Sequence, residues 1–352
     1  MASAKYVAYI GTYPKKRSKG IMICDVDPKK GSLSLRRVEP IEHPSVLCVH
    51  PTKKILYCNS NKGVAYFRIG EDGDLTRIKD CYIDAMRPRY ISTNSTGTLL
   101  FTGGYHDAKI TAHKLGRDGK IGALTAEAFH EGYGTVAERT YTPHISCVIP
   151  TPDDKFLCAV DNGTDRVNLF RIGKNGSLEL DGTFHCLPGT GPRAILFGNR
   201  NKNAYIVSNI SNTVTVFSYK PGTEASPPQF KPIQTIETAS DDINAQYDMS
   251  AAIRFSPDGK YFFATTAGDN TATLFSVNQD GTLERIFSLP VSGAYPKDIV
   301  FLPGENHFAV ACNESNIVNT FRIDYEKKIF LQEGRPLMID DPSTIEIVKL
   351  ES

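Results

Sequence analysis

The sequence lacks the marks of three large classes of protein. Its 40 Lys and Arg residues are balanced by 39 Asp and Glu residues, for a formal net charge of +1, so it has no basic surplus with which to neutralise nucleic-acid phosphates. No apolar run approaches the roughly 18 residues of a membrane-spanning helix. The eight cysteines include no CxxC pair, which argues against a zinc site. We therefore expect neither nucleic acid nor a membrane as a partner, and neither a metal nor another cofactor.

The cysteines and the first residues indicate the compartment. Most cysteines lie inside strand-like apolar runs, where a reduced thiol behaves as a small hydrophobic side chain. The segment from Met1 to Lys5 leads directly into a strand-like stretch, without the apolar core of a secretion signal. We therefore expect a cytoplasmic protein with reduced cysteines.

What the sequence does contain is a repeat of roughly 40–60 residues, a spacing typical of β-propellers and solenoids. A typical copy starts with a proline before an apolar run, continues through two further β-rich stretches, and ends with a turn such as Asp280-Gly281-Thr282-Leu283. The opening prolines are Pro44, Pro88, Pro143, Pro192 and Pro296, and the fifth of the six copies, around Ser250 to Ile253, has none.

A seventh copy is divided between the two ends of the sequence. Tyr6 to Gly11 reads as a second strand and Gly20 to Val26 as a third, whereas Ile345 to Leu350 reads as an opening strand. A solenoid needs capping repeats, but two complementary half-repeats close a ring and protect the sheet edges. We therefore predict an all-β fold, a seven-bladed β-propeller of residues 1–352 in one domain, with four antiparallel strands per blade and the last blade closed by both ends.

The repeat also predicts a binding site. Successive strands are antiparallel, so the residues after the opening prolines should surround one mouth of the central channel. These residues are Ser45, Arg89, His144, Arg193, Lys297 and Ser343. Three cations and a histidine at one mouth predict a site for a carboxylate or phosphate.

The loops between second and third strands should reach the same mouth. They contribute Asn59, Tyr105, His106, Asp161, Asn209, Asp269, Asn313 and Glu314. Two long connections, 122–142 and 222–249, are expected to wall the pocket, and the first of them contains Glu138 and Arg139. A structural interpretation remains open for single residues, because an arginine near a propeller axis can neutralise inward acidic groups and His144 can be a structural histidine.

Several short motifs resemble a known family, the seven-bladed lactonase propellers, which include propeller-type 6-phosphogluconolactonases and the fungal carboxy-muconate lactonizing enzyme. The chain has no tryptophan, unlike WD40 and quinoprotein propellers. The resemblance covers essentially the whole chain. The matching segments are Tyr9-Ile10-Gly11-Thr12-Tyr13, Arg139-Thr140-Tyr141-Thr142-Pro143-His144-Ile145-Ser146, Asp161-Asn162-Gly163-Thr164-Asp165-Arg166-Val167 and Pro188-Gly189-Thr190-Gly191-Pro192-Arg193.

The resemblance implies a set of pocket residues and also several departures. The pocket histidine and arginine of the family fall on His144 and Arg193, and its pocket acid falls on Asn209. The second histidine of the family signature corresponds to Ser146 in this chain. A further arginine of the family corresponds to a position near Ala267, where this chain has no arginine. The pocket is thus expected to keep anion-binding groups and to lose an acid and a base.

These residues suggest a metal-independent lactonase for an acidic sugar lactone. A histidine can exchange a proton at neutral pH, and an arginine can stabilise the oxyanion. We expect catalysis from His144 and Arg193, with Asp161 or Glu138 orienting the imidazole. The expected substrate-binding residues are Arg89, Arg139, Glu138, Lys297, Asn209, Tyr105, His106 and Asn313.

Two other functions remain open. The same groups could serve a lyase or isomerase of an unsaturated or cyclic carboxylic acid, or a propeller that binds an anionic ligand without catalysis. In every case the expected partner is a small anionic molecule, and the protein is expected to be a monomer or homodimer.

Overall fold

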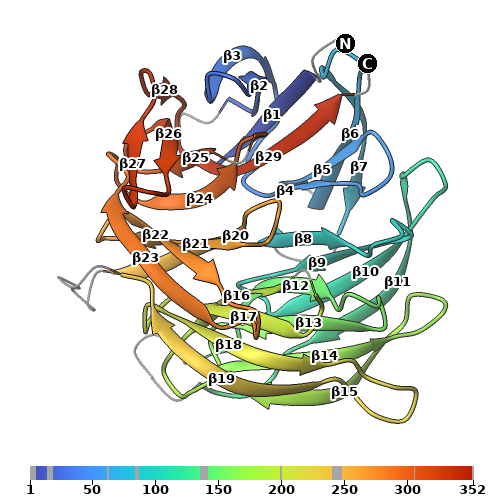
Figure 1. The fold of residues 1–352 in the computed structure, drawn as a ribbon. Coiled ribbons are helices and arrows are strands. Elements are labelled where there is room, and N and C mark those ends of the chain that lie inside the picture. The colour runs from blue at the N-terminus through green and yellow to red at the C-terminus, as the bar shows by residue number, and fades with distance from the viewer. Residues whose placement is uncertain are drawn as a thin grey trace.

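The regular structure of the chain consists of β-strands arranged as blades around an axis (Figure 1). In the computed structural model, the described residues are 5–13, 19–61, 63–83, 87–134, 142–198, 200–239, 248–304 and 306–350. Within them, 29 strands form seven antiparallel sheets. No helix of these residues is long and apolar enough to cross a membrane.

Each blade begins at the central channel. The innermost strands, which contact one another around the ring, are β4 (Leu47–Val49), β8 (Tyr90–Thr93), β12 (Ile145–Pro150), β16 (Pro192–Phe197), β20 (Met249–Phe255), β24 (Pro296–Phe301) and β29 (Pro342–Leu350). The second strands are β5 (Ile55–Ser60), β9 (Leu99–Gly103), β13 (Phe156–Asp161), β17 (Asn203–Ser208), β21 (Tyr261–Ala267), β25 (His307–Cys312) and β1 (Lys5–Thr12).

The remaining strands complete each blade toward its outer edge. The third strands are β6 (Gly63–Ile69), β10 (Lys109–Leu115), β14 (Arg166–Ile172), β18 (Thr213–Lys220), β22 (Thr271–Val277), β26 (Ile317–Asp324) and β2 (Ile21–Asp27). The outer strands are β7 (Leu75–Tyr82), β11 (Ile121–Phe129), β15 (Leu178–His185), β19 (Gln229–Glu237), β23 (Leu283–Pro290), β27 (Ile329–Gln332) with the short β28 (Leu337–Met338), and β3 (Ser32–Glu39).

The two ends of the chain share one blade, as the sequence predicts. Strand β29 pairs antiparallel with β1, from Lys5 opposite Leu350 to Ile10 opposite Ile345. The order in this sheet is β29-β1-β2-β3, and Figure 1 shows the N and C marks close together beside it. The predicted seven-bladed propeller with four-stranded blades is therefore confirmed, while its single-domain organisation stays a prediction.

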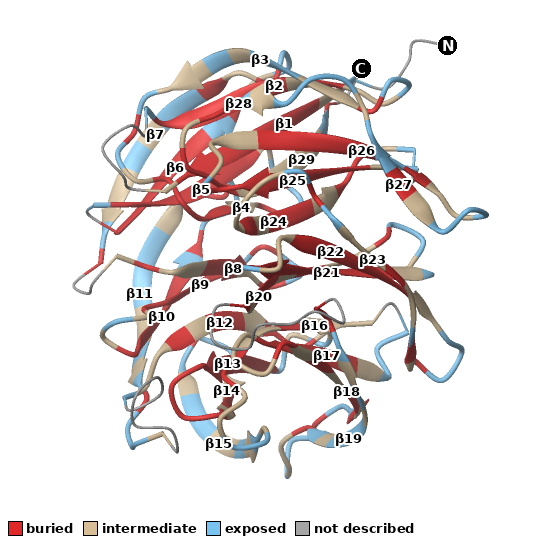
Figure 2. Ribbon diagram, turned by 90° about the vertical axis from the view of Figure 1, so that its left-hand side faces the viewer, coloured by how far each residue is buried: buried red, intermediate tan, exposed pale blue. Residues whose placement is uncertain are grey.

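The hydrophobic core consists of seven clusters, each between two neighbouring blades. Second strands are covered on both faces, and all six residues of β5 and of β13 are buried. Outer strands such as β15 keep exposed residues, which appear pale blue at the periphery in Figure 2. The near-continuous apolar runs of the inner strands therefore reflect burial on two faces.

The repeated Asp-Gly turns also connect blades. The Tyr9 hydroxyl donates to the Gly73 carbonyl oxygen at 2.7 Å, and Tyr205 donates to Gly281 at 2.7 Å. Both glycines have positive φ angles of 84° and 88°, which side chains other than glycine rarely adopt. Each turn thus accepts a hydrogen bond from the preceding blade, at the face opposite the predicted site.

The two connections that were expected to wall the pocket contain outer strands of their blades. Residues 122–129 of the first segment belong to the outer strand β11, and residues 229–237 of the second belong to the outer strand β19. Residues 135–141 and 240–247 lie outside the described residues. Glu138 and Arg139 are among them, so their predicted roles stay predictions.

Candidate functional site

A cavity of about 850 Å³ occupies the channel at the mouth where the innermost strands begin. Both predicted circles contribute to it, which confirms that strand starts and second-to-third loops share one face. The predicted residues that line it are Ser45, Asn59, Arg89, Tyr105, His106, Arg193, Asn209, Lys297 and Ser343.

Local irregularities aim two of the cations into the cavity. The pairing of β16 with β17 shifts by one residue between Pro192 and Ala194, and that of β24 with β25 shifts between Pro296 and Asp298. Arg193 and Lys297 are therefore the extra residues of β-bulges, which redirect side chains near sites. Both side chains line the cavity.

The Pro-Gly-Thr-Gly-Pro loop before Arg193 is held by a carboxylate of the preceding blade. Asp165 accepts hydrogen bonds from the backbone N–H groups of Gly189 at 2.7 Å and Gly191 at 2.8 Å. The two glycines have φ angles of 76° and 62°, in the left-handed region that favours glycine. The two motifs that resemble the lactonase propellers thus contact each other and position Arg193.

The cations lie close together in a confined space. The Arg193 Nε donates to the Ala251 carbonyl oxygen at 2.5 Å, and burial together with the nearby Arg89 lowers the pKa of its guanidinium. Lys297 Nζ lies 3.7 Å from the centre of the Tyr13 ring, and the Arg89 guanidinium lies 5.8 Å from it. The mouth therefore concentrates positive charge around one aromatic ring.

The backbone beside Lys297 is strained. Tyr295, which lines the cavity, has a φ angle of 58°, an unusual conformation for a bulky residue. A hydrogen bond from its N–H to the Asn270 Oδ1 at 2.8 Å holds this conformation. Such strain concentrates at functional sites.

Uncharged polar groups form another part of the wall. The Tyr105 hydroxyl donates to the Asn162 Oδ1 at 3.4 Å, and the Asn162 Nδ2 donates to the Asn209 Oδ1 at 3.3 Å. Burial raises the pKa of Tyr105, although Arg193 and Arg89 oppose the shift. Tyr105 therefore stays a neutral donor, suited to substrate hydroxyl or carboxylate oxygens.

His144 differs from its expected placement. The bulge of β12 lies between Ile145 and Cys147, so the residue that corresponds to Arg193 is Ser146. Ser146 lines the cavity, whereas His144 is not among the lining residues. The His144 ring instead stacks on Tyr105 at 4.5 Å and 8°, with Nδ1 at 2.8 Å from the Tyr105 carbonyl oxygen. This contact fixes Nδ1–H as the donor and leaves Nε2 3.4 Å from the Thr142 hydroxyl.

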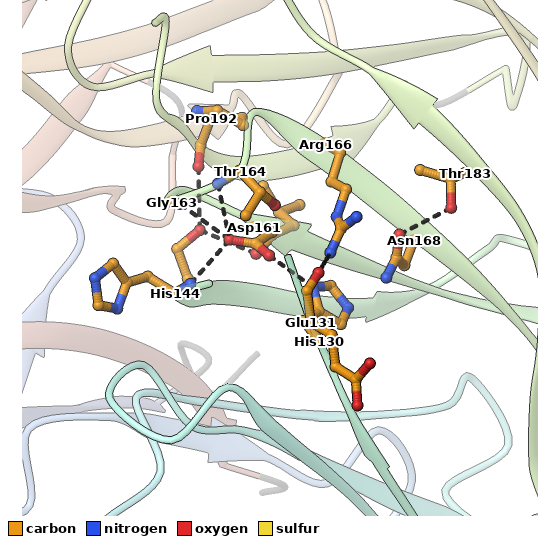
Figure 3. Close-up of polar contacts among 12 residues, drawn as sticks. His130, Glu131, His144, Asp161, Gly163, Thr164, Arg166, Asn168, Thr183 and Pro192 are labelled. Atoms are coloured by element: carbon orange, nitrogen blue, oxygen red, sulfur yellow. Dashed lines mark hydrogen bonds and ion pairs between the residues drawn. The ribbon is translucent and has the colours of Figure 1, made fainter. Parts of the chain in front are cut away.

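Asp161 is likewise placed away from the cavity wall. Its side chain is fully buried, and its Oδ1 accepts hydrogen bonds from the backbone N–H groups of His144, Gly163 and Thr164 at 2.8, 3.0 and 3.2 Å. Its Oδ2 lies 2.9 Å from the Nδ1 of His130. Figure 3 shows the His144 ring pointing away from this carboxylate. Asp161 therefore holds the backbone of His144. The sequence had suggested that Asp161 orients the His144 imidazole, and the structure shows no such contact between the two side chains.

The pKa of Asp161 reflects these donors. Burial raises the pKa of a carboxyl group, but the hydrogen bonds from His130, the His144 backbone and Thr164 outweigh it. The result is a pKa below the ordinary value, so Asp161 is an ionised structural group at neutral pH.

A second cluster of charges lines the cavity and was missed from the sequence. Arg254 of β20, Asp298 of β24 and Glu346 of β29 come from three neighbouring innermost strands. The Arg254 guanidinium lies 3.3 Å from the Asp298 carboxylate and 3.9 Å from that of Glu346. Burial, and secondarily Asp298, raises the pKa of Glu346 to about 7, although Arg254 opposes the shift. The only signal in the sequence was a charged residue among the apolar residues of each of these three strands.

Asn313, which was also predicted to bind substrate, makes a contact within the protein instead. Asn313 is buried outside the cavity lining, and its Nδ2 donates to the Pro342 carbonyl oxygen at 2.9 Å. Among the residues that the structure describes, no three His, Cys, Asp or Glu side chains are grouped to hold a metal ion.

Comparison with known proteins agrees with this architecture. The family described as "Lactonase, 7-bladed beta-propeller" matches residues 7–347. The chain belongs to this lactonase family. It is 31% identical over 317 residues to the 6-phosphogluconolactonase of Bacillus subtilis, with 88% of each chain covered.

Solved structures share the fold of this lactonase propeller over its whole length. A crystal structure described as a candidate 6-phosphogluconolactonase from Bacteroides fragilis has a TM-score of 0.89 and 28% identity, with 99% of each chain covered. The periplasmic gluconolactonase of Pseudomonas aeruginosa has a TM-score of 0.90 at 23% identity, with 99% of this chain and all of that chain covered. At that identity the second likeness concerns the fold alone.

Proposed function

We propose that this lactonase-family propeller hydrolyses a small lactone that carries an anionic group, such as an acidic sugar lactone. The observation that carries the proposal is the cluster of Arg89, Arg193 and Lys297 in one cavity of a size typical of small-molecule sites. Burial, and after it the nearby charge of Arg89, lowers the pKa of Arg193, so the charged guanidinium is disfavoured in the cavity. An anionic ligand would favour the charged form.

The cavity offers two kinds of contact to such a substrate. The cations can form charge-assisted hydrogen bonds with a carboxylate or phosphate, and Arg193 can also stabilise the oxyanion that develops on the lactone carbonyl. Tyr105, Asn162 and Asn209 supply neutral donors and acceptors for sugar hydroxyl groups. The reaction needs no metal in this proposal.

The placement of His144 favours an indirect role. Its ring supports Tyr105 by stacking and by the hydrogen bond to the Tyr105 carbonyl oxygen. We therefore assign His144 as a residue that positions Tyr105 in the cavity wall, in place of the direct proton transfer expected from the sequence. Glu138 and Arg139 remain candidates from outside the described residues.

The compartment and the assembly are part of the proposal. All eight cysteines are free thiols, and five of them are buried, which fits a reducing compartment. We propose a cytoplasmic monomer or homodimer. Light scattering of the purified chain measures the assembly, and a larger oligomer would contradict this part.

The decisive experiment is a ligand screen followed by a turnover assay. Sugar lactones, aldonates and muconate-like acids are tested by thermal shift, and each hit is followed by proton release and product analysis. Hydrolysis of an anionic lactone supports the proposal. Binding of aldonates without turnover would instead indicate a binding propeller, and elimination or isomerisation products would indicate a lyase or isomerase.

A variant pair identifies the anion site. We expect Arg193→Ala to weaken the binding of the anionic ligand by about 1.5–3 kcal/mol, the usual contribution of a hydrogen bond to a charged group. Arg68→Ala removes an exposed arginine on the third strand of another blade and serves as the control. Equal affinity of the two variants would contradict the assignment of the cations.

A further inference from the structure

We propose that Glu346 is the group that accepts and returns the proton during lactone hydrolysis, with Arg254 and Asp298 as its positioning residues. The inference rests on the proposed hydrolysis and adds the acid–base group of the same cavity. It also places this group on the strand that closes the ring.

The three side chains form a fixed cluster. Asp298 accepts hydrogen bonds from the backbone N–H of Ile299 and from that of Ile345, both at 2.9 Å, so its carboxylate joins β24 to β29. The Arg254 Nη2 lies 3.3 and 3.4 Å from the two Asp298 oxygens, and its Nε donates to the Ile299 carbonyl oxygen at 3.3 Å. Both partners of Glu346 are therefore immobilised before any substrate binds.

Glu346 itself retains access to the cavity. Its side chain is 29% exposed and lines the space, and the backbone of its strand pairs with β1. The charged and titratable groups that act on it are Arg254 from β20, Asp298 from β24 and the Cys48 thiol from β4. Burial raises the pKa of that thiol to about 12, so it stays neutral. The carboxyl group of Glu346 thus combines access with a pKa of about 7, suited to proton exchange at neutral pH.

The other proton-exchanging groups at the cavity are less suitable. The two oxygens of Asp298 are engaged by backbone N–H groups and by Arg254. His106 is exposed at the rim, with its ring edge-on to Tyr105 at 5.2 Å. Among the described residues that line the cavity, Glu346 is therefore the carboxyl group left with access and a suitable pKa.

The proposed step is an ordinary hydrolysis. The Glu346 carboxylate takes a proton from a water molecule while the water oxygen forms a bond to the lactone carbonyl carbon. The tetrahedral intermediate then collapses, the bond between the carbonyl carbon and the ring oxygen breaks, and the proton passes from Glu346 to the departing alkoxide. The product is the hydroxy acid, whose carboxyl group releases one proton to the solvent.

The experiment compares Glu346→Gln with Glu284→Gln, a matched change at an exposed position on outer strand β23. Initial rates on the lactone found in the screen are measured from about pH 5 to pH 9 and corrected for spontaneous hydrolysis. We expect Glu346→Gln to lower kcat by about 100-fold or more, with KM little changed and without the rise in kcat/KM near pH 7. Glu284→Gln should match the wild type.

A second variant keeps the test decisive if Glu346→Gln folds poorly. Asp298→Asn removes the negative charge that opposes ionisation of Glu346, so the rise in kcat/KM should move to lower pH. If Asp298 only supported the structure, Asp298→Asn would not change the pH at which kcat/KM rises. Loss of turnover without a shift, or an unchanged profile in Glu346→Gln, would overturn the role of Glu346 and leave the proposed hydrolysis intact.

The two proposals therefore fail in different ways. If the wild type hydrolyses no lactone, the proposed function fails, and the role of Glu346 fails with it. If the wild type hydrolyses the lactone and Glu346→Gln retains the same pH profile and kcat, only the role of Glu346 is wrong.

Discussion

Asp161 and Glu346 are two carboxyl groups near the same mouth with opposite surroundings. Asp161 is fully buried at the end of β13, where three backbone N–H groups and His130 surround its oxygens. Glu346 is 29% exposed in the cavity. The Arg254 guanidinium lies 3.9 Å from its carboxylate and also contacts the Asp298 carboxylate at 3.3 Å. The pKa of Asp161 is lowered, whereas that of Glu346 is raised to about 7.

The difference shows that burial alone does not decide the charge of a carboxyl group. The more buried group remains ionised because hydrogen-bond donors compensate its desolvation. The less buried group loses most of its hydration and gains only one opposing cation, which is shared with Asp298. Asp161 is therefore suited to hold a loop, and Glu346 to exchange a proton.

The largest expected effect is on folding. Asp161→Ala should lower the free energy of unfolding by about 3–5 kcal/mol, the scale for breaking a buried pair, because the N–H groups and His130 lose their acceptor. Glu346→Gln should change it far less at neutral pH. Urea unfolding of both variants measures the difference, and similar losses would remove the distinction between the two groups.

The pH dependence of stability should have opposite signs at the two sites. The lowered pKa of Asp161 contributes stability that is present above its unfolded value of about 3.9 and is lost as the pH falls through the folded pKa. The raised pKa of Glu346 means that the folded state keeps a proton that the unfolded state releases, so stability decreases as the pH rises from about 4.3 to about 7.

Unfolding of the wild type and Glu346→Gln across that range isolates the second contribution. Buried histidines such as His113, whose pKa burial lowers, contribute equally to both proteins. The stability of Glu346→Gln relative to the wild type should increase between about pH 4 and pH 7. A constant difference would mean that Glu346 titrates normally.

A smaller effect is expected from His144, which the sequence predicted as the catalytic histidine. His144→Ala should raise KM roughly tenfold, about 1.4 kcal/mol, because Tyr105 loses its stacking partner. The rise in kcat/KM near pH 7 should persist. Steady-state kinetics over pH measure both quantities, and loss of that rise in His144→Ala but not in Glu346→Gln would assign the proton transfer to His144.

The smallest effect concerns the missing acid. Asn209 lies on the cavity wall beside Asn162, and the resemblance to the lactonase propellers implies an acid at this position. Asn209→Glu should increase a weak activity on phosphogluconolactone by roughly several-fold, less than the roughly 100-fold or greater contribution of a fully positioned acid–base group. Rapid hydrolysis by the wild type with no change in Asn209→Glu would show that the asparagine costs nothing, and Asn209→Gln controls for side-chain length.

The architecture was predictable because the repeat is strongly patterned. The apolar runs and turns recur along the chain, the opening proline is missing only from the fifth copy, and Ile345 to Leu350 completes the blade that Tyr6 begins. Strand polarity followed from antiparallel pairing, so Arg89, Arg193 and Lys297 were correctly brought to one mouth. The sequence did not reveal where each strand is bulged, and this misplaced His144 by two residues relative to Ser146.

The acid–base cluster was missed for a different reason. Arg254, Asp298 and Glu346 lie inside strands whose other residues are largely apolar, and they are 44 to 92 residues apart in the chain. Only the ring brings the three strands together, so no local spacing connects these residues. Charges in an inner strand of a closed ring are thus a signal that needs the fold before it can be interpreted.

The blade that closes the ring, β29-β1-β2-β3, also carries the proposed acid–base group, Glu346. Strand β29 is held to β1 by pairing between opposite ends of the sequence and to β24 through Asp298. Strands at such a junction can open before the rest of the protein unfolds. Opening would withdraw Glu346 from Arg254 while the other six blades keep their sheets. Inactivation in mild denaturant should therefore precede the loss of β-structure. Enzymatic turnover would then report whether β29 is still paired in the ring.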